Sequence, residues 1–561
     1  MQFKFITIKN FRNFKDISIE LSNKNVIFGM NDVGKTNFLY ALRFLFEKDI
    51  RKQNFNNADY YKKNTDDPIE IILGIDISDT EDDDCKKLRA RLKGAILSDQ
   101  NIVYIKLQAT YDKKEMVGIP LLYWGGDLEE LEEMKVYGTF YEIDYVFNVI
   151  YIDAYVDLYA LFKKNTSMLL VNDKEQDKEI LDNIHSICDN LNTQISGLSG
   201  VKKFEEKISP EYKKFRHEDV SILVKSEIAV KGLYSNIVPY IKQDCDDSLY
   251  PTSGEGRKKL LVYSIFDLLA KEEEEKKINI FLIEEPENHL HRSMQISLSH
   301  ILFQNQKYQY LFLTTHSPYV LAEMDKVNLV RIYNEDKIVS KSALYTVPKN
   351  FSSQRKMLNR GLVEAIFADK VLLVEGPSEN VLFGKVLSEI NPFYEADGIY
   401  ILPVLGFGFR PYFEILNALN ITNVIKTDND LRNIKRQGKY SVLGFSRLNR
   451  YIGENLLPEE PIDECGVEAK RNLYDSNKQK LDQIREEYLM FLSRCSLEED
   501  LDEVIHDQMV EYLPEADGDP IRYLQNAKNN NMVKLVEKLT PEDCRIIYNH
   551  YNFACLKEIM S

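Results

Sequence analysis

The chain has 561 residues, 44% hydrophobic and 29% charged, a composition typical of a globular protein with about three or four domains. Its 72 basic and 89 acidic residues give a net charge of −17, so binding to DNA or RNA would require a local basic surface. Seven scattered cysteines without a CxxC pair argue against a zinc ribbon or a disulfide framework. Because the sequence shows no signal-peptide core and no apolar run of about 20 residues, we expect a cytoplasmic protein.

Strand-like and helix-like patterns alternate in the N-terminal part of the chain. Alternating or apolar runs predict strands, a helical spacing of apolar residues after a glycine loop predicts a helix, and an acidic stretch predicts a turn between two strands. The expected strands are 3–8, 17–21, 26–28, 69–77 and 101–110, the helix covers 38–46, and the turn covers 81–84.

The middle of the chain has a different texture. Charged helix-forming residues dominate from about 157 to 245, which predicts a helical insertion that is too short for the coiled-coil arms of chromosome-structuring ATPases. An α/β pattern then returns and continues to the C-terminus. It is expected to comprise a helix after 256, strands at 278–283 and 310–314, and a second α/β unit that starts with a strand at 370–374.

A glycine loop follows the predicted strand 26–28. The run Gly29-Met-Asn-Asp-Val-Gly-Lys-Thr36 fits the phosphate-loop pattern GxxxxGK[ST] in the expected strand–loop–helix context. Backbone N–H groups of such a loop surround the β-phosphate, Lys35 supplies a positive charge and Thr36 can bind Mg²⁺. A glycine turn that caps a helix is the simpler alternative. We assign nucleotide binding here to Asn31, Gly34, Lys35 and Thr36.

Two acids and a histidine follow later strands. The apolar run 278–283 ends in Glu284 and Glu285, which is the form of a Walker B segment. The first acid would hold Mg²⁺ through water and the second would orient the attacking water. His316 follows the strand 310–314 and could sense the γ-phosphate. Strands that end in solvated carboxylates are common, and a lone histidine is more often structural, but the place of His316 one strand beyond the acids favours the sensor role.

The third nucleotide element is a loop that contains Ser253 and Gly254 before an apolar helix, and a dimer mate could present it to the γ-phosphate. The order of the elements resembles the ABC-type ATP heads of RecF-, SMC- and OLD-type proteins. The opening Ile8-Lys-Asn-Phe-Arg-Asn-Phe14 is similar to the start of these heads. Glu284 stands where they usually have Asp, so the sequence predicts ATP binding and leaves ATP hydrolysis open.

A second acidic site follows further downstream. Glu375 ends a strand, Glu379 lies in the first turn of the next helix, and Asp428 and Asp430 follow another apolar segment. Carboxyl ends of parallel strands meet at one edge of a sheet, so these acids can converge. Facing carboxylates repel unless cations lie between them, and two Mg²⁺ or Mn²⁺ ions about 4 Å apart would suit phosphodiester cleavage. The alternative is a solvated strand edge.

The pattern E-G-x-x-E…D-x-D resembles the TOPRIM domain, and an ATP head followed by TOPRIM is the OLD arrangement. By this resemblance alone, Asp500 belongs to a further acidic motif and Lys528 is the catalytic lysine. The similarity is closer still to the nuclease subunits of Gabija anti-phage systems, through the blocks 28–43, 250–257, 284–287, 375–379, 426–431 and 553–558. These blocks span essentially the whole chain.

The resemblance implies a metal-dependent double-stranded DNA endonuclease that ATP holds back and that nucleotide depletion releases. It also implies a homo-oligomer, a dimer or tetramer, assembled through the head and its insertion, with a UvrD-like helicase subunit as partner. In the Gabija nucleases, Glu at the first Walker B position is normal. The expected fold is α/β, with the ATPase head at 1–156 and 249–360, the helical insertion at 157–248 and the TOPRIM domain at 361–561.

Two other functions fit parts of the pattern. A RecF-like DNA-binding ATPase would use residues 361–561 as a non-catalytic docking module, but such a module has no need of three clustered acids. A topoisomerase or primase would also use TOPRIM, but the chain lacks zinc-ribbon cysteines. We therefore expect a nucleotide-regulated endonuclease.

Overall fold

The computed structural model describes residues 1–29, 33–92, 100–155, 161, 178–206, 240–242, 249–251, 256, 258–259, 261–266, 276–335, 337–349, 355–435 and 437–561. The chain divides into two compact units. The larger unit comprises Met1–Tyr151, Ile280–Glu287 and Arg292–Ser561, and the smaller comprises Ile152–Asn279 and Asn288–His291. Among the described residues, no helix is long and apolar enough to cross a membrane.

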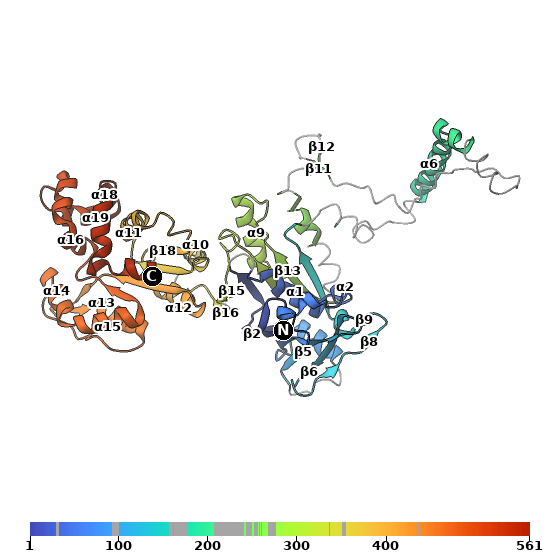
Figure 1. Cartoon of the computed structure of the whole chain (residues 1–561), viewed down its shortest axis with the longest axis horizontal. Coiled ribbons are helices and arrows are strands. Elements are labelled where there is room, and N and C mark those ends of the chain that lie inside the picture. Colours follow the sequence, from blue (N-terminus) through green and yellow to red (C-terminus); the bar gives the residue numbers. More distant parts are fainter. Residues whose placement is uncertain are drawn as a thin grey trace. The chain divides into compact units, whose positions relative to one another are not determined.

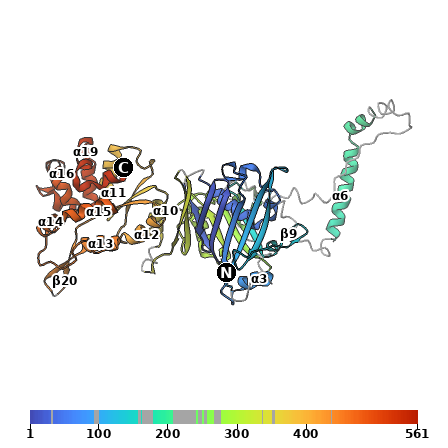
Figure 2. The same cartoon turned by 60° about the horizontal axis from the view of Figure 1, so that its bottom comes forward.

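The N-terminal part of the larger unit contains an antiparallel sheet with the strand order β2-β1-β4-β5-β6-β7 (Figure 2). Alternate residues of β5 are buried, which is the period-2 pattern of a sheet with one face on the core. The strands are β1 (Gln2–Phe11), β2 (Phe14–Glu20), β4 (Ile69–Asp76), β5 (Ile102–Asp112), β6 (Val117–Gly125) and β7 (Glu132–Glu133).

A second sheet has the order β10-β13-β14-β3-β15-β16. β13, β14, β3 and β15 pair in parallel, and β16 pairs antiparallel with β15. β13 and β14 are mostly apolar and almost entirely buried, as expected for strands covered on both faces. The strands are β3 (Lys24–Phe28), β10 (Phe147–Ile152), β13 (Ile278–Glu284), β14 (Leu311–Thr314), β15 (Val327–Glu335) and β16 (Lys337–Tyr345).

The C-terminal part contains a four-stranded sheet with the order β18-β17-β19-β22, and every pairing in it is parallel (Figure 1). Its strands are β17 (Lys370–Val374), β18 (Ile399–Pro403), β19 (Thr422–Thr427) and β22 (Met490–Leu492). A hairpin of β20 (Leu431–Ile434) and β21 (Lys439–Val442) follows β19. Because all four strands run in the same direction, their carboxyl ends lie at the same edge of the sheet.

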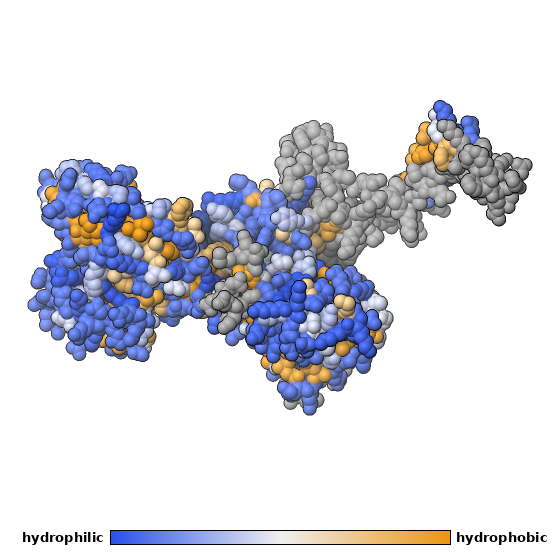
Figure 3. Space-filling view, in the orientation of Figure 1, coloured by the Kyte–Doolittle hydropathy of each residue, from blue (hydrophilic) through white to orange (hydrophobic). Residues whose placement is uncertain are grey.

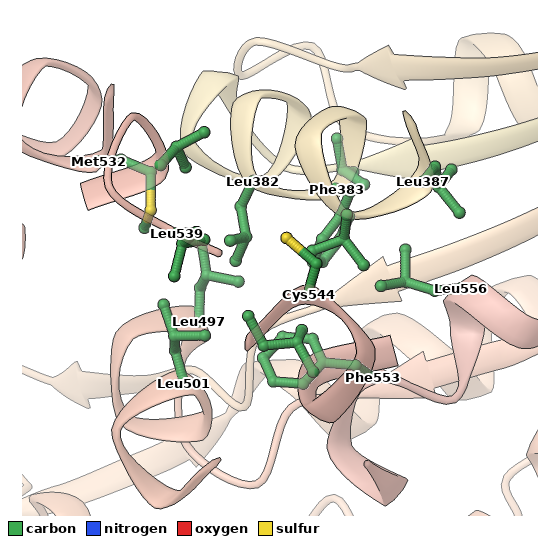
Figure 4. Close-up of a cluster of buried hydrophobic side chains, with 14 of the residues drawn as sticks. Leu382, Phe383, Leu387, Leu497, Leu501, Met532, Leu539, Cys544, Phe553 and Leu556 are labelled. Carbon is green, nitrogen blue, oxygen red and sulfur yellow. The ribbon is translucent and has the colours of Figure 1, made fainter. Parts of the chain in front are cut away.

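Helices pack on this sheet through a large apolar cluster (Figure 4). Leu382 and Phe383 of α11 face Leu501 of α16, Cys544 of α19 and Leu556 of α20, and all five side chains are buried. The helices of this part are α10 (Arg355–Ile366), α11 (Pro377–Ile390), α12 (Arg410–Ala418), α13 (Leu443–Ile452), α14 (Val467–Ser476), α15 (Lys478–Tyr488), α16 (Leu497–Tyr512), α17 (Pro520–Asn526), α18 (Lys528–Val536), α19 (Pro541–Asn549) and α20 (Cys555–Met560).

Further helices and strands are described in the N-terminal and central parts of the chain. They are α1 (Lys35–Phe46), α2 (Lys48–Arg51), α3 (Asp83–Arg91), α6 (Lys178–Ser196) and α9 (Arg292–Gln304), and the strands β8 (Val136–Tyr137), β9 (Phe140–Tyr141), β11 (Tyr240–Lys242) and β12 (Leu249–Pro251). The expected helix 38–46 forms the body of α1, and its apolar positions are buried.

Two local expectations differ from the structure. The acidic stretch 81–84 leads into a helix, α3, because the Asp82 side chain caps it by accepting the Cys85 N–H and because Cys85 and Leu88 are buried. The stretch 157–245 contains the strand β11, which pairs antiparallel with β12, besides the helix α6. Pairing with a later segment supplies the partner that the local pattern did not indicate.

Candidate functional site

The phosphate loop begins where β3 ends and stops at α1. Gly34 caps α1 with a left-handed φ of 108°, and a Cβ there would lie 1.8 Å from Nδ2 of Asn13. Only glycine fits both requirements. The Lys35 ammonium donates to the carbonyl of Gly29 at 3.1 Å, so its charge lies over the loop. Thr36 is exposed in the first turn of α1, and Asn31 lies outside the described residues.

The opening motif of the chain supports this loop, a role that the sequence did not reveal. Asn13 donates from Nδ2 to the carbonyl of Val33 at 2.6 Å and accepts from Nδ2 of Asn37 at 2.8 Å. Arg12 donates to Asn37 at 2.9 Å and forms an ion pair with Asp59 at 3.0 Å. The first turn of α1 is therefore fixed by residues that the motif I-x-N-F-R-N-F supplies.

The Walker B acids lie at the end of β13. Glu284 is buried, and Glu285 has a φ of 39°, a conformation that is strained for a residue with a Cβ. The backbone N–H of Glu285 donates to the carbonyl of Thr314 at 2.9 Å, which joins the ends of β13 and β14. Strain of this kind is typical of residues whose side chains have a fixed direction for function.

His316 follows β14 and lies near Glu285 of the Walker B segment and Lys35 of the phosphate loop. Its Nε2 is 3.6 Å from the carboxylate of Glu285, and burial together with the charge of Lys35 lowers its pKa. His316 is therefore neutral near neutral pH. Glu287 fixes this corner, because its carboxylate accepts the His316 N–H at 2.6 Å and the Thr315 hydroxyl at 2.9 Å.

Together, Lys35, Glu285 and His316 meet at the carboxyl ends of β3, β13 and β14, which are neighbours in one sheet. In open α/β sheets, ligands bind outside such carboxyl ends of the strands. Ser253 and Gly254, the expected third element of the site, lie outside the described residues.

The downstream acids converge at the edge of the parallel C-terminal sheet. Glu375 follows β17, and its Oε1 accepts the backbone N–H of Asp428 at 3.0 Å and the hydroxyl of Thr427 at 2.6 Å. Asp430 lies two residues further along, and Glu379 is buried in the first turn of α11. The structure therefore brings the ends of β17 and β19 together as expected.

Arg447 is a residue of this cluster that sequence reasoning missed. From α13 its guanidinium contacts Glu375 and Thr427, and its Nη2 donates to Asp430 at 3.2 Å. It is 72 residues from Glu375 in the chain, so no local motif marks it. The only available signal was a basic residue on a helix soon after the acids.

Asp428 has a strongly perturbed carboxyl group. Burial raises its pKa, and the nearby carboxylates of Glu375, Glu379 and Asp430 raise it further. Among the described residues, no three acidic, histidine or cysteine side chains surround one point closely enough to hold a metal ion. The donor chemistry still fits a divalent cation, because Glu375, Glu379 and Asp430 lie near enough to Asp428 to raise its pKa and carboxylate oxygens are the ligands that such cations take.

Two further residues, Asp500 and Lys528, were assigned by the family resemblance. Asp500, which is 1% exposed, forms an ion pair with Lys426 at 3.2 Å and accepts the Arg494 N–H at 3.0 Å. Burial raises its pKa and the charge of Lys426 lowers it. Lys528 begins α18, but its side chain lies outside what the structure describes. Both assignments stay predictions.

The chain was compared with known proteins. Residues 366–430 match the family model of the TOPRIM domain of overcoming lysogenization defect protein-like proteins, and residues 1–251 and 163–321 match an AAA ATPase domain. Endonuclease GajA of Bacillus cereus (strain VD045) is 46% identical over 575 residues, which cover 100% of this chain and 99% of that protein. The chain belongs to the GajA endonuclease family.

A second GajA, from Bacillus cereus (strain HuB5-5), is 21% identical over 45% of this chain and 42% of its own length. The SMC head domain from Thermotoga maritima aligns with 62% of this chain and 100% of its own, at 14% identity and a TM-score of 0.30. The C-terminal region of the Burkholderia pseudomallei OLD protein aligns with 35% of this chain and 98% of its own, at 21% identity and a TM-score of 0.25. Both structural scores are too low to establish a common fold.

Membership of the GajA family confirms three expectations from the sequence: the α/β fold with an ATPase head followed by a TOPRIM domain, the endonuclease class, and the OLD-type relationship. It does not favour the RecF-like docking alternative. Use of ATP and of a divalent metal follows in general from the two domain types.

Proposed function

We propose that this GajA-family chain is a nucleotide-regulated endonuclease of anti-phage defence that hydrolyses phosphodiester bonds of double-stranded DNA at its TOPRIM edge. The observation that carries this proposal is the hydrogen bond between Glu375 and the backbone of Asp428, which joins two acid-bearing strand ends. The raised pKa of Asp428 supports it, because burial and the neighbouring acids oppose its negative charge and a bound cation would relieve that repulsion.

The residues proposed to hold Mg²⁺ or Mn²⁺ are Glu375, Glu379, Asp428, Asp430 and Asp500. When bound, the cations supply charge that stabilises the attacking and leaving oxygens. The chain's own contribution is to fix the ligands: Thr427 and the Asp428 N–H hold Glu375 in one orientation. Lys528 is proposed to stabilise the charge that develops on the phosphate.

Plasmid cleavage tests the nuclease site. Purified protein with Mg²⁺ or Mn²⁺ is expected to convert supercoiled plasmid to nicked or linear forms, and Glu375→Gln is expected to lose this activity by at least about a hundredfold. Glu454→Gln, which changes the charge equally at an exposed residue of the same domain, serves as the control. Wild-type rates in Glu375→Gln would overturn the assignment.

We propose that ATP binds between the phosphate loop and the β13 and β14 ends, with Mg²⁺ near Thr36, Glu284 and Glu285, and that bound ATP restrains cleavage. Ser253 and Gly254 are proposed to approach the γ-phosphate from a second copy. Lys35→Ala removes the charge that lies over the loop, so ATP should no longer slow plasmid cleavage by this variant. Lys52→Ala, at an exposed site, should respond to ATP as the parent does.

We further propose that the chain forms a dimer or tetramer through the helix α6. Its exposed Ile180, Ile187 and Leu191 recur with Ile184 at alternating spacings of four and three residues, which is typical of the seam of a coiled coil. Hydrophobic surface is visible on this helix in Figure 3. Ile187→Lys should lower the mass measured by light scattering, whereas His185→Lys, on the opposite side of the helix, should not.

Because the chain resembles the nuclease subunits of Gabija systems, we also propose a UvrD-like helicase subunit as its partner.

A further inference from the structure

Arg447 is a cation inside the acidic cluster. It projects from α13, the helix that follows the β20–β21 hairpin, and its side chain is 24% exposed. One of its terminal nitrogens contacts Glu375 and Thr427 and the other donates to Asp430 at 3.2 Å. A single guanidinium therefore bridges the ends of both acid-bearing strands.

The donors that surround Glu375 meet at one atom. Thr427, the backbone N–H of Asp428 and the Arg447 guanidinium all donate to Oε1. The Thr427 hydroxyl and the Asp428 N–H belong to the backbone or to a short side chain at the end of β19, so they stay in place when the surroundings change. Arg447 is the long and partly exposed one, and it can turn toward solvent without moving a strand.

A divalent cation bound between Glu375 and Asp430 would use carboxylate lone pairs on the side where Arg447 now binds. Oxygen ligands approach Mg²⁺ to about 2.1 Å, which leaves no space for a guanidinium hydrogen bond to the same lone pair. A guanidinium is always protonated, so it cannot leave by losing its charge. It can leave only by moving.

We propose that Arg447 is a positioning residue that serves as the internal counter-ion of the TOPRIM acids. It holds Glu375 and Asp430 in the metal-free protein and competes with the divalent cation for them. The inference rests on the proposed metal site. Metal binding then requires the displacement of the Arg447 side chain, and this competition sets the cation concentration at which the site fills.

The test is Mn²⁺ binding to the full chain without nucleotide, measured by calorimetry and by the loss of the free-ion electron paramagnetic resonance signal. Arg447→Met keeps the aliphatic length of the side chain and removes the competing charge. We expect it to bind Mn²⁺ roughly tenfold more tightly than the parent. Arg450→Met, which removes an equal charge from an exposed position of the same helix, should change the affinity less than about twofold.

A second readout is thermal unfolding in the presence of EDTA and of Mn²⁺. Without its counter-ion, Arg447→Met should melt below the parent in EDTA and recover most of that difference in Mn²⁺. Arg447→Lys keeps the charge without the two-pronged geometry and should lie between parent and Arg447→Met in both measurements. A side chain that only supports the fold would lower the melting temperature equally with and without metal.

Two results would overturn the inference in distinguishable ways. If Glu375→Gln weakens Mn²⁺ binding but Arg447→Met binds Mn²⁺ no more tightly than the parent, Arg447 is no competitor although the metal site stands. If Glu375→Gln leaves Mn²⁺ binding unchanged, the metal site itself is wrong and the role of Arg447 falls with it.

Discussion

Oε1 of Glu375 lies 3.0 Å from the backbone nitrogen of Asp428 and accepts its hydrogen bond. The contact crosses from the end of β17 to the end of β19, two parallel neighbours in the C-terminal sheet. The contact fixes the backbone position of Asp428 and so places its carboxyl group beside those of Glu375, Glu379 and Asp430. Burial and these neighbours raise the pKa of Asp428, because both oppose its negative charge.

This relationship predicts a pH-dependent stability of the metal-free protein. Since the folded pKa of Asp428 lies above its unfolded value, the folded state binds the proton more tightly, and stability falls as pH rises through that interval. Asp428→Asn removes the penalty. In EDTA near pH 7, we expect the variant to melt about 3 °C above the parent, with the gain vanishing toward about pH 4. Equal melting temperatures at all pH values would contradict the prediction.

A second prediction concerns the link between the head and the TOPRIM domain. Arg331 of β15 donates to the carboxylate of Asp369 and to the carbonyl of Asn420, both at 2.9 Å. Beside it, the rings of Phe28 and Phe367 pack edge to face with centroids 5.8 Å apart. Phe28 immediately precedes the phosphate loop, and the strand β17 begins just after Asp369, so these contacts lie between the segments that lead to the two sites.

Arg331→Met should therefore reduce the effect of ATP on plasmid cleavage at least about fivefold while metal-dependent cleavage persists, because the coupling contact is lost and both sites are intact. The measured quantity is the ratio of cleavage rates with and without ATP. Arg360→Met, which removes an exposed arginine of α10, is the matched control. If the ratio for Arg331→Met equals that of the control, the effect of ATP on cleavage does not depend on the Arg331 contact.

The third prediction concerns Glu287, which holds the His316 corner by accepting two hydrogen bonds. Glu287→Ala leaves the Thr315 hydroxyl and the His316 N–H without this acceptor, which costs about 1–3 kcal/mol for each buried group. We expect ATP affinity, measured by calorimetry, to fall about tenfold. Glu287→Gln keeps one acceptor oxygen and should retain most of the affinity, and an equal loss in both variants would point to the charge instead.

The sequence predicted the elements whose signals are local. The glycine loop between 26–28 and 38–46, and the strand 370–374 that precedes Glu375, are marked by residues adjacent in the chain, and parallel pairing then brings strand ends together. Arg447 and Lys426 could not be found in this way. Arg447 meets Glu375 across 72 residues and Lys426 meets Asp500 across 74 residues, so both roles depend on how the whole domain packs.

The pair of Lys426 and Asp500 gives the fourth prediction, because it separates folding from catalysis. Both side chains are at most 2% exposed, and the Lys426 ammonium also donates to the carbonyl of Asn552 at 3.0 Å. Removing one partner leaves the other as an uncompensated buried charge, which lowers the free energy of unfolding by about 3–5 kcal/mol. Asp500→Leu and Lys426→Met alone should therefore destabilise the protein strongly in chemical denaturation.

The double variant, with Asp500→Leu and Lys426→Met together, buries no charge and should recover most of the lost stability. Plasmid cleavage then reports on Asp500 without the confounding effect of unfolding. Since the family resemblance assigns Asp500 to the metal-binding acids, we expect the double variant to be stable but to cleave at least about a hundredfold more slowly than the parent. Recovery of cleavage together with stability would show that Asp500 serves only as the buried partner of Lys426.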